Sequence, residues 1–237
     1  MKIKIVCLIF ILCFSGYAFA QKQKPWSRSD FDHDRYHLGA LLSFNSATYY
    51  VKFKEDFGGN DSLVNILLRP QPGFNIHFVA QLNLTPNFNL RFVPGLDFHE
   101  RKLVYTIKKD TGIDVFELKL ESVPFILPVY LKWRTDRINN FAAYAIGGGY
   151  FSMDVMHNRK LLNNGSFSAL TIQTTRNDWG YAVGGGFDFF LPYFKFGIEL
   201  KYNVGMKNVL VQDGTYFANP LESVRNGSWV FSLTFEG

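Results

Sequence analysis

The chain has 237 residues and a mass of 27.2 kDa, which suits one large domain. Aromatic residues make up 17% and charged residues 19% of it, a balance that excludes an intrinsically disordered chain. Without Lys2 and Lys4 the chain has 23 basic against 20 acidic residues, a dispersed +3 that excludes a nucleic-acid-binding surface.

Residues 1–20 have the pattern of a secretory signal peptide. Lys2 and Lys4 form a positive start, residues 5–14 are apolar, and Ala18-Phe19-Ala20 is a small-residue cleavage pattern. An uncleaved membrane anchor is the alternative, although the apolar run is short for a transmembrane helix. The protein is therefore expected to be exported, and residues 21–35 are predicted to form a polar periplasmic arm. Both cysteines lie inside the signal, so the mature chain is expected to lack disulfides.

From Tyr36 onward the chain alternates between apolar and polar residues. Phe194, Phe196 and Ile198 share one parity, whereas Lys195 and Gly197 share the other. Such alternation predicts β-strands with a different environment on each face. Eight strands are predicted, over residues 36–45, 73–83, 88–100, 119–134, 141–154, 179–190, 194–206 and 228–236.

The connections between these strands alternate in length. Those over 84–87, 135–140 and 191–193 are short. Those over 46–72, 101–118, 155–178 and 207–227 are long and polar. Short periplasmic turns and long outer loops are typical of outer-membrane barrels. Residues 36–237 are therefore predicted to form an all-β, eight-stranded, antiparallel up-and-down transmembrane outer-membrane β-barrel with both termini in the periplasm.

A soluble ligand-binding barrel also alternates, but with its apolar face inward. Here the apolar face carries mainly Phe, Leu, Ile, Tyr and Trp, while the other face carries Gly, Asn, Ser, Lys, Glu, Asp and His. An eight-stranded interior is only wide enough to be filled by side chains, so the bulky set is expected outside, against lipid. The polar set is then expected to form an ion-pair network that plugs the lumen, with Arg91, Asp97, His99, Lys132, Arg134, Asp188, Lys195, Glu199 and Lys201.

Three prolines fall inside predicted strands. Pro94 lies in the third strand, and Pro124 and Pro128 lie in the fourth. Each proline removes a donor from the hydrogen-bond ladder. If the hairpin turns near Thr111, Pro94 lies opposite Pro128 and two missing donors meet in one seam. A β-bulge and a weakened lateral seam are both open interpretations.

Several segments resemble the PorT family, also called SprT, in order and spacing. They are Arg91-Phe92-Val93-Pro94-Gly95-Leu96-Asp97-Phe98, Leu103-Val104-Tyr105-Thr106, residues 134–144, 184–189, 193–196 and 208–211, and Ser232-Leu233-Thr234-Phe235-Glu236. The resemblance covers about 36–236. It implies an outer-membrane component of the type IX secretion system, which exports cargo with C-terminal sorting domains. The implied partners are outer-membrane lipid and other components of that system.

No catalytic, cofactor-binding or metal-binding residue is predicted, and no small-molecule substrate or nucleic acid is expected as a partner. The glycine runs 147–149 and 184–186 lack the Lys-Ser/Thr of a phosphate-binding loop. His157 with Asp154, or His99 with Glu100 and Asp97, could be considered as catalytic groups. His99 and Glu100 are neighbours on a strand and point to opposite faces, which argues against a shared role. Two alternatives remain: a structural or adhesion barrel that binds through its outer loops, and an outer-membrane hydrolase or acyltransferase.

Overall fold

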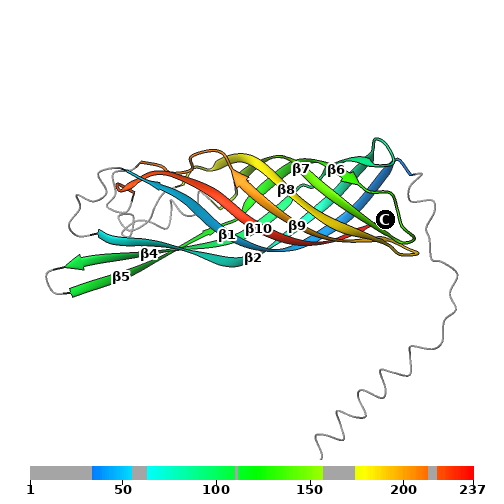
Figure 1. The fold of residues 1–237 in the computed structure, drawn as a ribbon. Coiled ribbons are helices and arrows are strands. Elements are labelled where there is room, and N and C mark those ends of the chain that lie inside the picture. The colour runs from blue at the N-terminus through cyan, green and yellow to red at the C-terminus, as the bar shows by residue number, and fades with distance from the viewer. Residues whose placement is uncertain (1–33, 55–62, 110–111, 157–173, 213–217) are drawn as a thin grey trace, which may run out of the picture.

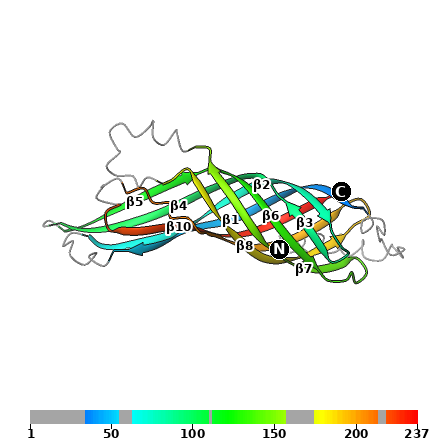
Figure 2. The ribbon, with the colours of Figure 1, turned by 90° about the horizontal axis from the view of Figure 1, so that it is seen from above.

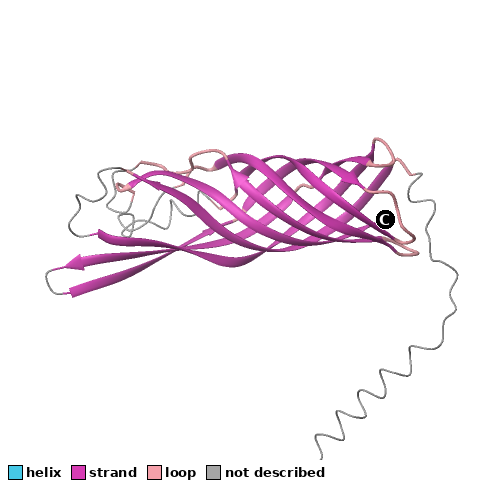
Figure 3. Ribbon diagram, viewed as in Figure 1, coloured by secondary structure: helices cyan, strands magenta, loops and turns pink. Residues whose placement is uncertain are grey.

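The computed structural model describes residues 34–54, 63–109, 112–156, 174–212 and 218–237. The predicted signal peptide and nearly all of the predicted periplasmic arm lie outside these ranges. Antiparallel β-strands form the described part of the chain (Figure 3). Within these ranges, no helix has the length and hydropathy to cross a membrane.

Ten strand segments make up eight passes of the wall. Two of the predicted strands are each interrupted once, at Val93-Pro94 and at Val123, where the prolines break the ladder. The register continues across both breaks, because Gly95 lies opposite Ile126 and His99 opposite Ser122. The eight-stranded prediction is therefore confirmed. The segments are β1 (Tyr36–Phe53), β2 (Leu63–Asn83), β3 (Phe88–Phe92), β4 (Gly95–Lys109), β5 (Gly112–Ser122), β6 (Pro124–Arg134), β7 (Phe141–Asp154), β8 (Asn177–Phe190), β9 (Lys195–Gly205) and β10 (Leu221–Glu236).

The sheet closes on itself into a tilted barrel (Figures 1 and 2). Neighbouring passes pair in chain order, and β1 pairs with β2 on one side and with β10 on the other. Gly39 lies opposite Glu236, so the start of β1 and the end of β10 meet at one end of the barrel. The short turns lie at this same end. In outer-membrane barrels this end faces the periplasm, and the opposite end faces outside.

A band of large apolar side chains covers the outside of the barrel near the termini. Phe78 is 50% and Trp133 51% exposed although both are apolar, as lipid contact requires. Along β1 the band runs from Tyr36 to Phe44, roughly the 9–11 residues of a transmembrane strand. Trp133 lies at its periplasmic edge, and Trp179 and Trp229 lie near its outer edge. Their positions match the aromatic girdles of membrane barrels.

Several strands continue well beyond the membrane band, so the long-loop prediction is wrong over much of its length. β1 continues to Phe53 and β2 begins at Leu63, within the segment 46–72. β4 and β5 form a long hairpin across most of 101–118, and β10 begins at Leu221. Most of the predicted loop 155–178 lies outside the described residues. We call the part of the wall beyond the membrane band the extracellular extension: residues 46–53, 63–72, 100–109, 112–122 and 221–228.

The apolar parity changes where the wall leaves the membrane, and this explains the error. On β1, Leu42 and Phe44 face outward, but beyond them Ser46 takes the outward position. Ala47 and Tyr49, of the opposite parity, are buried inside. Beyond the membrane, water rather than lipid surrounds the wall, so apolar residues occupy the inward positions instead of the outward ones. The strand itself keeps the same inward and outward positions.

The extracellular extension has a hydrophobic core of its own. β1, β2, β4, β5, β10 and the segment before β10 supply it, with Tyr49, Ile66, Leu103, Tyr105, Leu120, Val209, Leu210, Ala218, Leu221 and Val224. Its outer surface is polar: Lys102 forms an ion pair with Glu117 at 2.5 Å, and a hydrogen bond from Lys102 lowers the pKa of that carboxyl. The extension is thus a folded structure outside the membrane.

The extension is split along one line. Pairing of β1 with β2 ends at Ala47 opposite Gln71, and beyond that point β1 pairs with β10 alone. β2 pairs onward with β4, with an irregularity between Pro70 and Phe74. The wall therefore divides above the membrane into a β1–β10 part and a β2–β4–β5 part (Figure 1).

Candidate functional site

The charged residues predicted to line the lumen all lie inside the barrel. They occupy the inward parity of their strands, and each is at most 9% exposed: Arg91, Asp97, His99, Lys132, Arg134, Asp188, Lys195, Glu199 and Lys201. The structure divides them into a central network, an outer group near the extracellular mouth and one residue at the periplasmic end.

Arg91 of β3 is the hub of the central network. Its guanidinium donates to Glu199 of β9 at 3.0 Å and also forms an ion pair with Glu236 of β10. Lys195 contacts Glu236 at 2.7 Å, and Lys201 forms an ion pair with Glu199. Each of the two carboxylates is therefore shared between two cations, inside a wall that excludes water.

A second pair joins the same network across the barrel. The ammonium of Lys132 on β6 donates to Asp188 of β8 at 2.7 Å and lies 3.6 Å from the centre of the Tyr144 ring. The Tyr144 hydroxyl donates to Glu199 at 2.9 Å. Charges of both signs from β3, β6, β8, β9 and β10 thus meet in one hydrogen-bonded cluster, as buried ions require.

Sequence reasoning missed two members of this cluster, Glu236 and Tyr144. Glu236 has the same inward parity as Ser232 and Thr234 on β10, so the alternation contains the signal that locates it. Arg134 lies elsewhere, at the periplasmic end of the lumen. There it donates to the Pro86 carbonyl at 3.0 Å.

The outer group is centred on Asp97. His77 of β2 contacts Asp97 at 2.7 Å, and His99 lies 3.5 Å from the other carboxylate oxygen. Arg101 donates to Nδ1 of His99 at 3.0 Å. His77 and Arg101 were not predicted. Arg101 lies just beyond the end of the predicted strand, where the change of parity conceals it.

The glycine runs make room for the interior side chains. A Cβ on Gly148 would lie 2.1 Å from the Val129 carbonyl oxygen and 2.8 Å from the Tyr130 Cα. A Cβ on Gly186 would lie 2.7 Å from the hydroxyl of Tyr144. These positions therefore serve close packing of the lumen.

The filled interior leads to a prediction about ion flow. Buried ion pairs join five strands across the lumen. We expect them to block a continuous water path, so the purified protein should give no steady porin-like current in a planar bilayer. Single-channel recording checks this, with a known porin as the positive control. Stable open-channel steps would contradict a plugged lumen.

The prolines are arranged differently from the prediction. The Pro94 carbonyl accepts from Phe78 of β2 at 2.9 Å, whereas the Pro128 carbonyl accepts from Val93 at 3.3 Å. The N and C=O of one residue point to the same neighbour in an antiparallel strand. The missing donor of Pro94 therefore faces β2, and that of Pro128 faces the β3–β4 pass. The expectation that these two gaps meet in one seam is corrected.

Pro124 and Pro128 do share a seam. They are four residues apart on one pass, so both missing donors face the β3–β4 pass. The strand pairing agrees, because Gly95 and Leu96 are the only described residues of β4 that pair with β6. The ladder between these two passes therefore lacks two donors in the stretch next to Asp97.

Restoring the two donors tests whether the missing hydrogen bonds in this seam affect stability or cellular function. The Pro124→Ala, Pro128→Ala variant should fold and gain stability, since each regained hydrogen bond contributes about 0.5–1.5 kcal/mol. If function needs the seam to open, the same variant should lose activity in the cell. The measurement pairs urea unfolding in vesicles with a cellular assay. Wild-type activity in a stabilised variant would assign the prolines a structural role alone.

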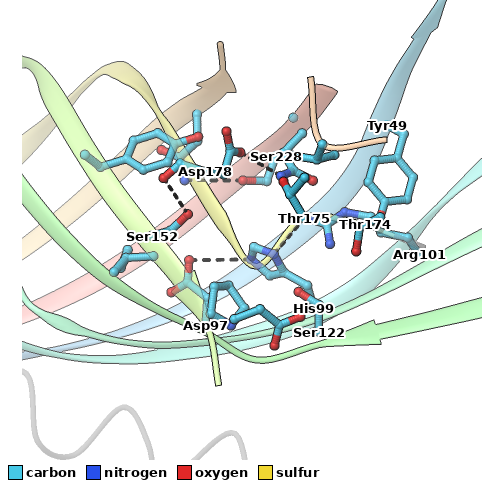
Figure 4. Close-up of a pocket in the computed structure, with 18 of the residues that line it drawn as sticks. Tyr49, Asp97, His99, Arg101, Ser122, Ser152, Thr174, Thr175, Asp178 and Ser228 are labelled. Atoms are coloured by element: carbon cyan, nitrogen blue, oxygen red, sulfur yellow. Dashed lines mark hydrogen bonds and ion pairs between the residues drawn. The ribbon is translucent and has the colours of Figure 1, made fainter. Parts of the chain in front are cut away.

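A small cavity lies at the level where the membrane band meets the extracellular extension. Asp97, His99 and Arg101 of β4 line it together with Tyr49 of β1 and Asp178 of β8 (Figure 4). Its volume is about 60 Å³. It is the place where the polar lumen, the split in the wall and the extracellular core come together.

Of the residues considered from sequence as catalytic groups, the structure brings His99 and Asp97 together, at 3.5 Å. Glu100 points away from His99 and pairs with Lys119 at 3.6 Å on the outer surface. His157, the candidate partner of Asp154, lies outside the described residues. Within the described ranges, no cluster of three His, Cys, Asp or Glu side chains has the geometry of a metal site.

Comparisons with solved structures return other small barrels. Ail of Yersinia pestis, in complex with the heparin analogue sucrose octasulfate, is 12% identical, with a TM-score of 0.40, over 86% of this chain and 100% of that one. OprG of Pseudomonas aeruginosa is 11% identical, with a TM-score of 0.44, over 85% and 95%. The outer-membrane protease OmpT of Escherichia coli is 10% identical, with a TM-score of 0.40, over 86% and 96%. At these scores the likenesses carry no argument about function.

A comparison with curated protein sequences gives no match. A family model does match: the outer membrane protein beta-barrel domain, over residues 19–211. The match covers most of the chain and agrees with the closed barrel and its lipid-facing apolar band. This chain therefore belongs to the outer membrane protein beta-barrel domain family and is a small barrel of the outer membrane.

Proposed function

We propose that this protein is a non-enzymatic accessory of protein export by the type IX secretion system and acts through its extracellular extension. The observation that carries the mode of action is the contrast between a filled lumen and a folded structure beyond the membrane. A barrel of this kind works by binding other proteins at its surface. The export process itself is supported by the resemblance of residues 91–98 and 134–144 to the PorT family.

The partners in this proposal are other components of the secretion system. The β4–β5 hairpin projects furthest from the membrane and carries charged side chains on its outer surface (Figure 1). Loops and extensions on a rigid scaffold are common places for recognition. We assign partner contact to this hairpin and the adjoining part of β2.

The experiment is deletion of the gene, followed by fractionation of cells and medium for cargo proteins with C-terminal sorting domains. Cargo should accumulate in the periplasm and return to the surface or medium when a plasmid restores the gene. An unrelated outer-membrane protein should remain at its normal level in the same cells. Normal cargo release in the deletion strain would reject the export role.

An adhesion or structural barrel is the second candidate, and the same extension favours it. A folded projection beyond the membrane also suits binding to another cell or to a matrix. The two candidates separate in the deletion strain, because loss of an adhesion barrel lowers surface binding while cargo release continues. A third candidate, an outer-membrane hydrolase or acyltransferase, requires one interior or rim residue whose substitution abolishes turnover in an intact barrel.

A further inference from the structure

The cavity at the extracellular mouth has the size of a small ligand. At about 10–15 Å³ for each water-sized group, a volume of about 60 Å³ holds roughly four to six heavy atoms. Figure 4 shows His99 beside Asp97, with Arg101 and Tyr49 on the other side of the cavity. The charged groups that line it determine which ligand fits.

Arg101 is the group with unmet hydrogen-bonding capacity. It is 5% exposed, and one Nη donates to His99 while the guanidinium lies 4.8 Å from the centre of the Tyr49 ring. Its Nε has no hydrogen-bond partner. In the described ranges, no ion pair joins Arg101 to a carboxylate. A buried guanidinium in this state lacks the oxygen acceptors that such a group requires.

The carboxylates around the cavity already have donors. Asp97 accepts from His77 at 2.7 Å, and Asp178 accepts from the Asn226 side chain at 2.7 Å. Asp154 accepts from the Met156 backbone N–H at 2.9 Å. Besides the Arg101 Nε donor, one acceptor of the lining, Asn203 Oδ1, has no hydrogen-bond partner. Arg101 carries the charge, and an acceptor ligand completes its guanidinium.

We propose that this cavity binds a carboxylate group through Arg101. The planar guanidinium fork of Arg101 matches the two oxygens of a carboxylate. Asp97, Asp154 and Asp178 repel a doubly charged phosphate more strongly than a singly charged carboxylate. Two sources present this group, a free carboxylic acid and the C-terminus of a peptide. The site is independent of the proposed export role.

The test is a ligand titration of the full-length mature protein in detergent micelles, followed by saturation-transfer NMR. The probes are acetate, triglycine with a free C-terminus, triglycine amide and inorganic phosphate. Acetate should bind, and triglycine amide should not. Binding of free triglycine as well assigns the site to a chain terminus, whereas binding of acetate alone assigns it to a free acid.

Three variants give the controls. Arg101→Gln should weaken carboxylate binding about tenfold or more, because it removes the charge-assisted bonds. Arg101→Lys keeps the positive charge but loses the planar guanidinium, so it should lose less carboxylate affinity than Arg101→Gln. It serves as the test variant if Arg101→Gln does not fold. Arg69→Gln, an exposed arginine of β2, should bind like the wild type. Equal affinities of wild type and both Arg101 variants, no carboxylate binding, or binding of phosphate in its place would each overturn the proposal.

Discussion

Replacing Arg91 by methionine is expected to destabilise the barrel by about 3–5 kcal/mol, the cost of removing one partner from a buried ion pair. Arg91 is fully buried and contacts both Glu199 and Glu236. Without it, each carboxylate keeps one lysine partner inside a wall that water does not enter. The loss comes from the charge-assisted hydrogen bonds of Arg91 to both carboxylates, since the two remaining lysines still balance the two carboxylates in charge.

Urea unfolding in phospholipid vesicles measures this loss, with the fluorescence of the lipid-facing tryptophans as the signal. The matched control is Arg69→Met, which removes an exposed charge and should change stability by less than about 0.5 kcal/mol. Adding Glu236→Gln to Arg91→Met should deepen the loss, because the buried Lys195 then loses the carboxylate it contacts at 2.7 Å. Equal stability of Arg91→Met and Arg69→Met would show that the interior network contributes nothing to folding.

Replacing Leu103 by alanine is expected to loosen the extracellular extension and leave the membrane barrel intact. Leu103 is 2% exposed in the extracellular core, and buried Leu→Ala changes cost about 2–5 kcal/mol. The central ion-pair network lies in the membrane-spanning part of the barrel, so the loss is expected to stay within the extension. Amides of the β2, β4 and β5 extension should exchange on the order of thirtyfold faster or more.

Hydrogen exchange with mass spectrometry reads both regions in one sample. Leu67→Ala is the matched control, because Leu67 lies on the same extension but is 45% exposed. It should change exchange little. If Leu103→Ala accelerated exchange equally in the membrane-spanning strands, the extension and the barrel would be one cooperative unit rather than two.

The membrane part of the fold was predictable because two constant environments act on its strands. Between Tyr36 and Phe44, lipid lies on one side and the lumen on the other, so every outward position is apolar and Leu41 is the one large apolar residue among the inward positions. The same alternation located Arg91, Lys132 and Glu199 inside. The glycine run 147–149 blurs it on the pass over 141–154, and the short turns indicate which strands are neighbours.

The extracellular extension was not predictable by the same rule. Past Asn45 the apolar parity shifts to Ala47 and Tyr49, so a continuous strand looks like the end of one. On β2, Pro70 and Pro72 make the sequence look like a loop, although both residues pair with neighbouring strands. Arg101 was missed for the same reason, since it lies where the two patterns meet.

Residue spacing alone does not predict which prolines share a seam. Counting residues from the hairpin turn correctly placed Pro94 near Pro128. Which neighbour each nitrogen faces depends on the hydrogen-bond phase of the ladder, and the sequence does not specify that phase. In the structure the missing donor of Pro94 faces β2, whereas those of Pro124 and Pro128 both face the β3–β4 pass.

The most direct test of the account is to shorten the β4–β5 hairpin and measure cargo export. Arg101 lies opposite Leu120, so residues 102–119 can be replaced by an Asn-Gly turn that suits a two-residue hairpin. In a deletion strain the variant should reach the outer membrane as a folded, heat-modifiable barrel but leave cargo in the periplasm. Cargo release at the wild-type level by this shortened barrel would contradict a role for the extracellular extension in export.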